Sequence, residues 1–331
     1  MNICFIGIWD DFNILDEGMI KTNFFLVREI SKNHDVLTLS IFKFFSASFW
    51  KDIRSFNPDI IHYTCGGSLL SFFLLKIISM IFNSKSIMMT LQPHDYPFFS
   101  NFFVSKLSSD IILSQTQKQC KFYEKLGFKS LIFPSGVDIE EFRPVEDITK
   151  NFLRDKYGIS REKFIILHVG HIKKGRNLKA MKNLLNDDTE VLVVGSPSFK
   201  EDKEFNRLKE YGFNLLTHFI KNINEIYALS DCYIFPVFEE KECISMPLSV
   251  LEAMACNLPV ISSKFGDLDK FFSESDGLLF INEENEIINC IHKLKKLDAE
   301  NIRTREKVSE YSWKKLGLEM NKIYNDLKQK S

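Results

Sequence analysis

Glu252 is the only charged residue in a short apolar stretch that runs from Leu248 to Cys256. Leucine, alanine and methionine dominate this stretch, which predicts a largely buried helix. A carboxylate in such a helix is costly unless something pairs with it. It either reaches solvent or a basic neighbour, or it accepts hydrogen bonds from the hydroxyl groups of a ligand. The second alternative would make Glu252 a binding residue.

A basic loop, Gly170 to Asn177, follows an apolar run at 164–169 that predicts a strand. Its cationic or potentially cationic side chains include His171, Lys174 and Arg176. Cations and free backbone N–H groups at the end of a strand would hold a diphosphate. Basic loops are often only solvated, but the glycines of this loop favour the binding interpretation.

The residues around Glu252 predict a strand, a loop, a helix and a second strand. Tyr233 to Phe235 is a short apolar run typical of a buried strand. Pro247 suits the first position of the following helix. Asn257 ends that helix, and Pro259 prevents its continuation. Such a unit places a helix N-terminus at the carboxyl edge of a parallel sheet, where open α/β folds bind ligands and the helix dipole favours anions.

The chain as a whole fits two α/β domains. Its 331 residues suit two domains of ordinary size, and its net charge of −1 without a long basic block argues against nucleic acid as a partner. The seven cysteines are scattered and form no CxxC pair, which indicates core thiols in a reducing compartment. We therefore expect a cytoplasmic protein, and the N-terminus shows no signal-peptide pattern.

Two segments resemble a known family. They are PLSVLEAMACNLPVI at 247–261 and PSGVD…F.P at 134–144. The first resembles the signature of the retaining GT-B glycosyltransferases of family four, the group 1 glycosyl transferases, and the second resembles their interdomain segment. The resemblance implies an α/β fold of GT-B type, with two Rossmann-like, doubly wound domains that face a central cleft.

The same resemblance implies the domain limits. Residues 1–148 would form an N-terminal, acceptor-side domain, and residues 149–310 a C-terminal domain that binds the nucleotide sugar. The last helix, within 311–331, would return to pack on the N-terminal domain.

The family signature contains two glutamates separated by seven residues. The second one contacts the ribose of the donor in the family and corresponds to Glu252. The leading one contacts the donor sugar and would fall on Ile244, which carries no carboxylate. The nearest acids are Glu242, Glu240 and Glu239.

Further site residues follow from the resemblance. Catalytic roles are expected for His94, Lys174, Arg176 and Glu252, with Gln92 as the alternative to His94. Donor-binding roles are expected for Gly18, Gly170, His171, Phe219 and the loop Cys243, Ile244, Ser245 and Met246, whose backbone N–H groups would face phosphate or sugar. Lys174 matches the lysine of the family's K-G pair, His171 stands in place of the family's arginine, and Arg176 would supply that arginine.

The expected activity is retaining transfer of a sugar from a nucleotide sugar to a hydroxyl of a saccharide, a lipid-linked acceptor or another small acceptor. No cofactor and no metal are expected, because fixed cations can neutralise the diphosphate. The one DxD sequence, at 267–269, is interpreted as a helix start. The alternatives are a GT-B sugar epimerase, a phosphorylase-like enzyme, or a non-catalytic protein that binds a nucleotide sugar or a partner. The donor, the acceptor and the oligomeric state stay open.

The most apolar stretch, Leu69 to Phe82, is too short for a membrane span of about 20 residues and contains Lys76. It predicts a buried or surface-lying helix. Aromatic residues and lysines also gather at 42–50 and 97–107. Core packing is the simpler interpretation, and peripheral contact with a bilayer is the alternative.

Overall fold

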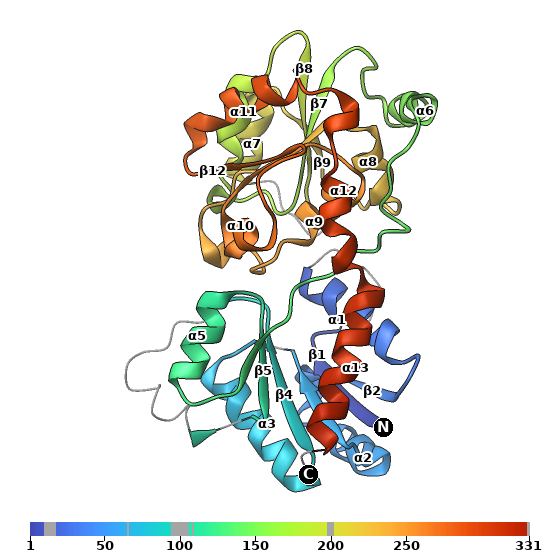
Figure 1. Ribbon diagram of the computed structural model, residues 1–331, viewed down its shortest axis with the longest axis vertical. Helices are drawn as coiled ribbons and strands as arrows, with labels where there is room; N and C mark the ends of the chain where they lie inside the picture. Colours follow the sequence, from blue (N-terminus) through green and yellow to red (C-terminus); the bar gives the residue numbers. More distant parts are fainter. Residues whose placement is uncertain (10–17, 65, 94–105, 108, 197–201, 330–331) are drawn as a thin grey trace. The chain divides into compact units, whose positions relative to one another are not determined.

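The computed structural model describes residues 1–9, 18–64, 66–93, 106–107, 109–196 and 202–329, which divide into two compact units (Figure 1). The first unit comprises Met1–Ser135, Cys243–Met246 and Trp313–Ser331. The second comprises Gly136–Glu242 and Pro247–Ser312. Residues 136–148, which the sequence assigns to the first domain, group with the second unit by their contacts.

The first unit contains a parallel six-stranded sheet with the strand order β2-β1-β3-β4-β5-β6. Its strands are β1 (Asn2–Gly7), β2 (Asp35–Ser40), β3 (Ile60–Tyr63), β4 (Lys85–Thr90), β5 (Ile111–Ser114) and β6 (Ser130–Ile132). Strands β3 and β5 are buried along their whole length and β4 along all but its first residue, as expected for a parallel sheet that is covered on both faces.

Helices cover both faces of the first sheet. They are α1 (Gly18–Ile30), α2 (Ala47–Phe56), α3 (Leu69–Phe82), α5 (Gln117–Lys125) and α13 (Trp313–Gln329). The buried residues of α2, α3 and α5 share one core cluster with the strands. On another side of the unit α13 packs against α1, and the hydroxyl of Tyr324 lies 2.6 Å from Nδ1 of His62 on β3. The last helix is therefore part of the first unit.

The second unit contains another parallel six-stranded sheet, in the order β12-β11-β10-β7-β8-β9. Its strands are β7 (Phe164–Val169), β8 (Thr189–Val194), β9 (Asn214–Leu216), β10 (Cys232–Phe235), β11 (Val260–Ser263) and β12 (Leu278–Ile281). Its helices are α6 (Asp147–Tyr157), α7 (Lys203–Glu210), α8 (Ile223–Leu229), α9 (Leu248–Ala255), α10 (Leu268–Phe271), α11 (Ile287–Leu294) and α12 (Thr304–Val308).

Short 3-10 helices complete the two units. They are η1 (Ile41–Lys43), η2 (Lys174–Arg176), η3 (Leu178–Leu184), η4 (Glu240–Glu242), η5 (Phe265–Asp267), η6 (Glu284–Glu286), η7 (Ala299–Asn301) and η8 (Ser309–Tyr311). The basic loop after β7 thus leads into η2 and η3. Asn177 separates the two in the left-handed conformation, with φ of 55°.

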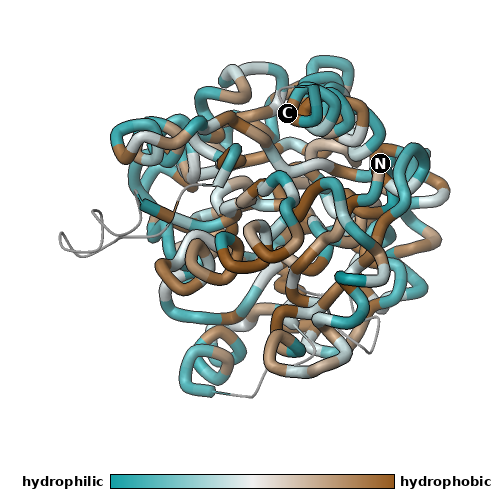
Figure 2. The backbone as a smooth tube through the Cα atoms, turned by 90° about the horizontal axis from the view of Figure 1, so that it is seen from below, coloured by the Kyte–Doolittle hydropathy of each residue, from teal (hydrophilic) through white to brown (hydrophobic). Residues whose placement is uncertain are grey.

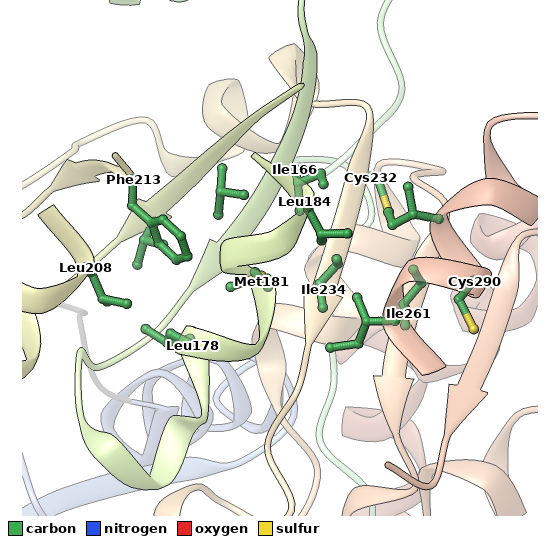
Figure 3. Packing of buried hydrophobic residues seen from close by; sticks show 14 of the residues in the cluster. Ile166, Leu178, Met181, Leu184, Leu208, Phe213, Cys232, Ile234, Ile261 and Cys290 are labelled. Carbon is green, nitrogen blue, oxygen red and sulfur yellow. The ribbon is translucent and has the colours of Figure 1, made fainter. Parts of the chain in front are cut away.

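The core of the second unit brings together apolar side chains of β7, β8, β10 and β11 with those of η3, α7 and α11 (Figure 3). Ile166 and Ile234 occupy the strand side, and Met181 and Leu208 come from covering helices. Figure 2 shows hydrophobic segments, drawn brown, alternating along the chain with hydrophilic segments, drawn teal. Within the described residues, every helix is too short or too polar to cross a membrane.

Candidate functional site

The second sheet has one point where its strand order reverses direction, between β7 and β10. The chain leaves β7 toward β8 on one side and later returns to β10 on the other side. At such a switch point the loops that follow the two strands diverge and leave room for a ligand at their carboxyl ends. Here those loops are 170–177, after β7, and 236–247, after β10. They contain most of the donor-site residues expected from the sequence.

Arg176 lies in the first of these loops and is 5% exposed. Its buried Nε has no hydrogen-bond partner within the described residues. Nor is an acidic partner for its guanidinium found in the part of the chain that the structure describes. A buried cation without a counter-ion is unfavourable in a folded protein. Arg176 is therefore well suited to receive an anionic ligand, for which its planar guanidinium offers paired donors.

Gly170 makes room for the Arg176 side chain. A Cβ at Gly170 would lie 3.2 Å from Nη1 of Arg176 and 3.3 Å from Nε2 of His168. Gly170 also has φ of 155°, a conformation that other residues seldom adopt. The neighbouring His168 is fully buried, and its Nδ1 contacts the carbonyl of Ile234 at 2.9 Å. Burial, together with the positive charge of Arg176, lowers the pKa of His168 to about 3, so this histidine is neutral beside the arginine.

Glu252 lies on α9 and is 5% exposed. The hydroxyl of Tyr227, on α8, donates a hydrogen bond of 2.7 Å to its Oε2. Burial, reinforced by the negative charge of Glu252, raises the pKa of Tyr227, so the hydroxyl keeps its proton and remains the donor. The carboxylate is thus fixed inside the unit rather than turned to bulk solvent.

The charges of Arg176 and Glu252 both affect the pKa of Tyr233. Burial raises the pKa of the Tyr233 hydroxyl on β10. The positive charge of Arg176 lowers this pKa in part, and the negative charge of Glu252 adds to the increase. Tyr233 also donates to the carbonyl of Val169, the last residue of β7, at 3.4 Å. Arg176 follows β7 and Glu252 follows β10, so a cation and a carboxylate lie on the segments after the two strands of the switch point.

The other expected donor residues of the second unit lie on its loops. Lys174 is exposed in η2, His171 is half-buried, and Phe219, which follows β9, is 53% exposed. Glu242, at the end of η4, lies against the basic loop: a Cβ at Gly175 would overlap its carboxyl group. Glu242, one of the acids nearest in sequence to Ile244, thus lies next to the basic loop.

The loop Cys243–Met246 belongs to the first unit. A Cβ at Gly18 would meet Cδ1 of Ile244 at 3.0 Å, so these two expected donor residues are neighbours. The N–H of Ser245 donates to the carbonyl of Leu91 at 2.8 Å, and the N–H of Met246 donates to Oε1 of Gln115 at 3.0 Å. Both groups, expected to face a ligand, are committed to protein acceptors in this structure. His94 lies outside the described residues.

The chain is similar to known glycosyltransferases. Residues 163–296, which contain β7 to β12 with Arg176 and Glu252, match the family described as Glycosyl transferases group 1. This segment of the chain resembles the group 1 glycosyl transferases. Sulfoquinovosyl transferase SQD2 of Arabidopsis thaliana is 25% identical over 295 residues, which are 80% of this chain and 56% of that protein. The putative teichuronic acid biosynthesis glycosyltransferase TuaC of Bacillus subtilis is 23% identical over 237 residues, 68% of this chain and 58% of that protein. The chain thus spans little more than half the length of these relatives.

Solved structures show the same architecture. Sucrose-phosphate synthase from Thermosynechococcus elongatus superposes with a TM-score of 0.80 at 17% identity and covers 100% of both chains. HepE from Anabaena in complex with UDP-glucose gives a TM-score of 0.76 at 14% identity, with 98% of this chain and 100% of that chain covered. The GT-B fold class expected from the sequence is therefore confirmed.

Within the segment that matches group 1, two functional candidates were missed by sequence reasoning. The sequence pattern assigns no role to Tyr227, although its hydroxyl holds Glu252. His168 was taken as part of a strand, although it borders Arg176. A tyrosine or histidine inside an apolar run carries a weak signal, since its polar atom needs a partner there. The partner itself is remote in sequence.

Proposed function

We propose that the chain is a retaining glycosyltransferase that moves a sugar from a nucleotide-sugar donor to a hydroxyl of a saccharide, lipid-linked or other small acceptor. The observation that carries the proposal is Arg176: a buried guanidinium at the switch point of the second sheet, whose Nε has no hydrogen-bond partner among the residues that the structure describes. A diphosphate would supply the missing counter-charge. The group 1 similarity of the same segment makes a nucleotide sugar the natural carrier of that diphosphate.

Each side chain then has a role that fits its position. Arg176, with Lys174 from the same 3-10 helix, binds the diphosphate and stabilises the charge that grows on it as the bond to the anomeric carbon breaks. Glu252, held by Tyr227, accepts hydrogen bonds from the ribose hydroxyls. Because Arg176 and Glu252 are buried and fixed by packing before the donor arrives, their positioning costs little at the moment of reaction.

Retention follows from attack on the same face that the leaving group departs from. The acceptor oxygen forms its bond to the anomeric carbon while the bond to the diphosphate oxygen breaks. That departing oxygen accepts the acceptor's proton, so no protein carboxylate needs to act as nucleophile. Fixed cations supply the charge stabilisation, and we propose that the enzyme works without a metal ion.

Glu242 is our candidate for the sugar contact that Ile244 cannot make. Its carboxyl group lies over Gly175 in the basic loop, within the second unit. A carboxylate there can accept hydrogen bonds from the sugar hydroxyls of a donor whose diphosphate binds the same loop. The expected result for Glu242→Ala is weaker binding of the nucleotide sugar with unchanged binding of the free nucleoside diphosphate. Equal affinities of the variant and the wild type for the sugar-bearing donor would remove Glu242 from the site.

UDP-sugars are the first donors to test, because the similar fold of HepE has been seen with UDP and with UDP-glucose. The expected location is cytoplasmic, where such donors are found and thiols stay reduced. Five of the six cysteines within the described residues are buried, and all six are free, in keeping with this expectation.

The second candidate is a non-catalytic protein that binds a nucleotide sugar. Ile244 favours it, since the position of the leading glutamate holds an apolar side chain packed against Gly18. A turnover assay separates the two. Purified protein is given UDP-, GDP- and ADP-sugars with lipid and saccharide acceptors, and the anomeric configuration of any product is read by NMR. Turnover with retention supports the transferase. Donor binding without turnover of any donor supports the non-catalytic alternative, and product with inverted configuration overturns the retaining mechanism.

A further inference from the structure

Helix α3 presents an apolar face to solvent. Its exposed large side chains are Leu69, Leu70, Phe73, Met80 and Ile81. They recur at helical spacing, whereas Phe72, Leu75 and Ile78 pack toward the sheet. Lys76 is the only charged residue of the helix. A surface helix of a globular protein normally carries polar residues on its outer side, so this face needs another explanation.

Aromatic residues from η1 and the following turn extend this face. Phe42 is 77% exposed and Phe45 is 95% exposed. The ring of Phe44 lies 5.1 Å from that of Trp50, and Trp50 stacks on Phe82 at the end of α3 at 6.1 Å. These contacts join the turn to the helix. We call the exposed residues of α3 together with Phe42 and Phe45 the apolar surface.

Basic residues border the apolar surface on two sides. Helix α2 packs on β1 and β2, α3 on β3 and β4, and α5 on β5 and β6, so the strand order places α3 between the other two helices (Figure 1). The exposed basic residues of α2 are Lys51 and Arg54, and those of α5 and its following turn are Lys118, Lys121, Lys125 and Lys129. The apolar surface thus lies between helices whose exposed charges are mostly basic, with Asp52 and Glu124 as their exposed acids.

The charge of this region differs from that of the chain. Residues 41–129 contain ten lysines and arginines but five aspartates and glutamates, whereas the whole chain carries 43 basic and 44 acidic residues. A second copy of the chain on this surface would bring like-charged borders together, which disfavours self-association. An anionic bilayer complements both parts, because its interface accepts apolar side chains and its head groups attract lysine and arginine.

We propose that the apolar surface docks the first unit onto an anionic lipid bilayer. The exposed residues of α3, with Phe42 and Phe45, enter the interface, and the basic residues of α2 and α5 face the lipid head groups. This inference goes beyond glycosyl transfer and needs no donor. If transfer also occurs, the docked unit would bring the enzyme to lipid-linked acceptors.

Vesicle co-sedimentation of the full chain tests the proposal. The probes are vesicles of phosphatidylcholine alone and of phosphatidylcholine mixed with phosphatidylglycerol, without nucleotide. We expect binding to the anionic vesicles, weaker binding to the neutral ones, and weakening by added salt. Leu70→Glu/Phe73→Glu should reduce the affinity about tenfold or more, because it places two carboxylates in the interface. Ile148→Glu/Phe152→Glu is the matched control, since both residues are exposed and apolar but lie on α6 of the second unit.

A second variant, Lys121→Glu/Lys125→Glu, changes only exposed charges and should weaken binding to anionic vesicles alone. Absence of binding to anionic vesicles overturns the proposal. So does equal binding by the wild type, the Leu70→Glu/Phe73→Glu variant and the Lys121→Glu/Lys125→Glu variant. A lipid-free dimer that Phe73→Glu dissociates would identify a second copy as the occupant and would overturn it as well. Nucleotide-sugar binding is measured on the same proteins. Because the vesicle variants keep the residues of the donor site, a failure of membrane binding can be told apart from a failure of the proposed glycosyltransferase function.

Discussion

The hydroxyl of Tyr227 donates a hydrogen bond of 2.7 Å to Oε2 of Glu252, so helix α8 fixes the carboxylate of α9 inside the second unit. Both residues are buried. A buried carboxylate is costly without hydrogen-bond donors, and the hydroxyl of Tyr227 supplies one. Tyr227 is therefore a positioning residue for the proposed donor site.

Replacement of Tyr227 by phenylalanine tests this positioning. Tyr227→Phe keeps the ring and removes one hydrogen bond to a charged group, which should lower the free energy of unfolding by about 1–3 kcal/mol. Donor affinity should also fall several-fold, because the carboxylate is less well fixed. Chemical denaturation and calorimetry measure the two effects, with the partly exposed Tyr211→Phe as the control. A loss of stability with wild-type donor affinity would reduce Tyr227 to a structural role.

Substitution of Arg176 should separate stability from binding. The Arg176 guanidinium is buried, and its Nε has no partner within the described residues, so Arg176→Gln should leave the stability of the unliganded protein unchanged or raise it. The binding free energy of the nucleotide sugar should become less favourable by about 1.5–3 kcal/mol, the range for a hydrogen bond to a charged group. Thermal unfolding with and without donor measures both quantities, with Lys179→Gln, an exposed residue of η3, as the control. An Arg176→Gln protein that is strongly destabilised and still binds the donor normally would contradict the assignment.

Two buried histidines should make the protein less stable in mild acid. Burial lowers the pKa of both His62 and His168 from 6.5 to about 3. Between pH 6.5 and pH 3 these histidines bind protons in the unfolded chain but not in the folded chain. The free energy of unfolding therefore has its full value above pH 6.5 and decreases as the pH falls toward 3. Each histidine should contribute a loss of about 2 kcal/mol between pH 7 and pH 5.

Urea unfolding at both pH values measures this loss. His62→Phe removes one of the two groups, so the loss between the two pH values should shrink by about half in the variant, since each histidine contributes equally. The same loss in the variant and the wild type would show that other groups control the pH dependence.

Gly317 tests the packing of the C-terminal helix within the first unit. A Cβ at this position would lie 2.6 Å from Cβ of Glu29 on α1, which is close to the backbone and has little freedom to move away. Gly317→Ala should therefore lower the free energy of unfolding by about 1–3 kcal/mol. Leu318→Ala, at the next and exposed position, should change it by no more than about 0.5 kcal/mol. Equal stability of the two variants would mean that α13 and α1 are less closely packed than described.

Local sequence signals predicted most of the fold. The apolar run Tyr233–Phe235 lies within β10, and the stretch that begins at Leu248 forms α9, which ends before Asn257 in the left-handed conformation. Pro247 is a small departure: it precedes the helix as its N-cap rather than forming its first turn. These features depend on neighbouring residues, which is why the sequence reveals them.

The contacts that build the site were harder to predict. Tyr227 and Glu252 are 25 residues apart, and the pairing of Met246 with Gln115 joins positions 131 residues apart. Glu242 reaches Gly175 across a similarly remote pair of loops. No periodicity or spacing encodes such pairs, because they arise only when the strands assemble in their final order. Family resemblance pointed to Glu252, but not to the group that holds it.

Titration calorimetry of nucleotide sugars against the wild type and Glu252→Ala tests the central claim most directly. We expect at least one UDP-, GDP- or ADP-sugar to bind the wild type, and Glu252→Ala to lower its affinity about tenfold or more because hydrogen bonds to a charged group are lost. Glu284→Ala, an exposed glutamate of the same unit, should bind like the wild type. Unchanged affinity in a folded Glu252→Ala protein, or no binding of any of these donors to the wild type, would contradict the account.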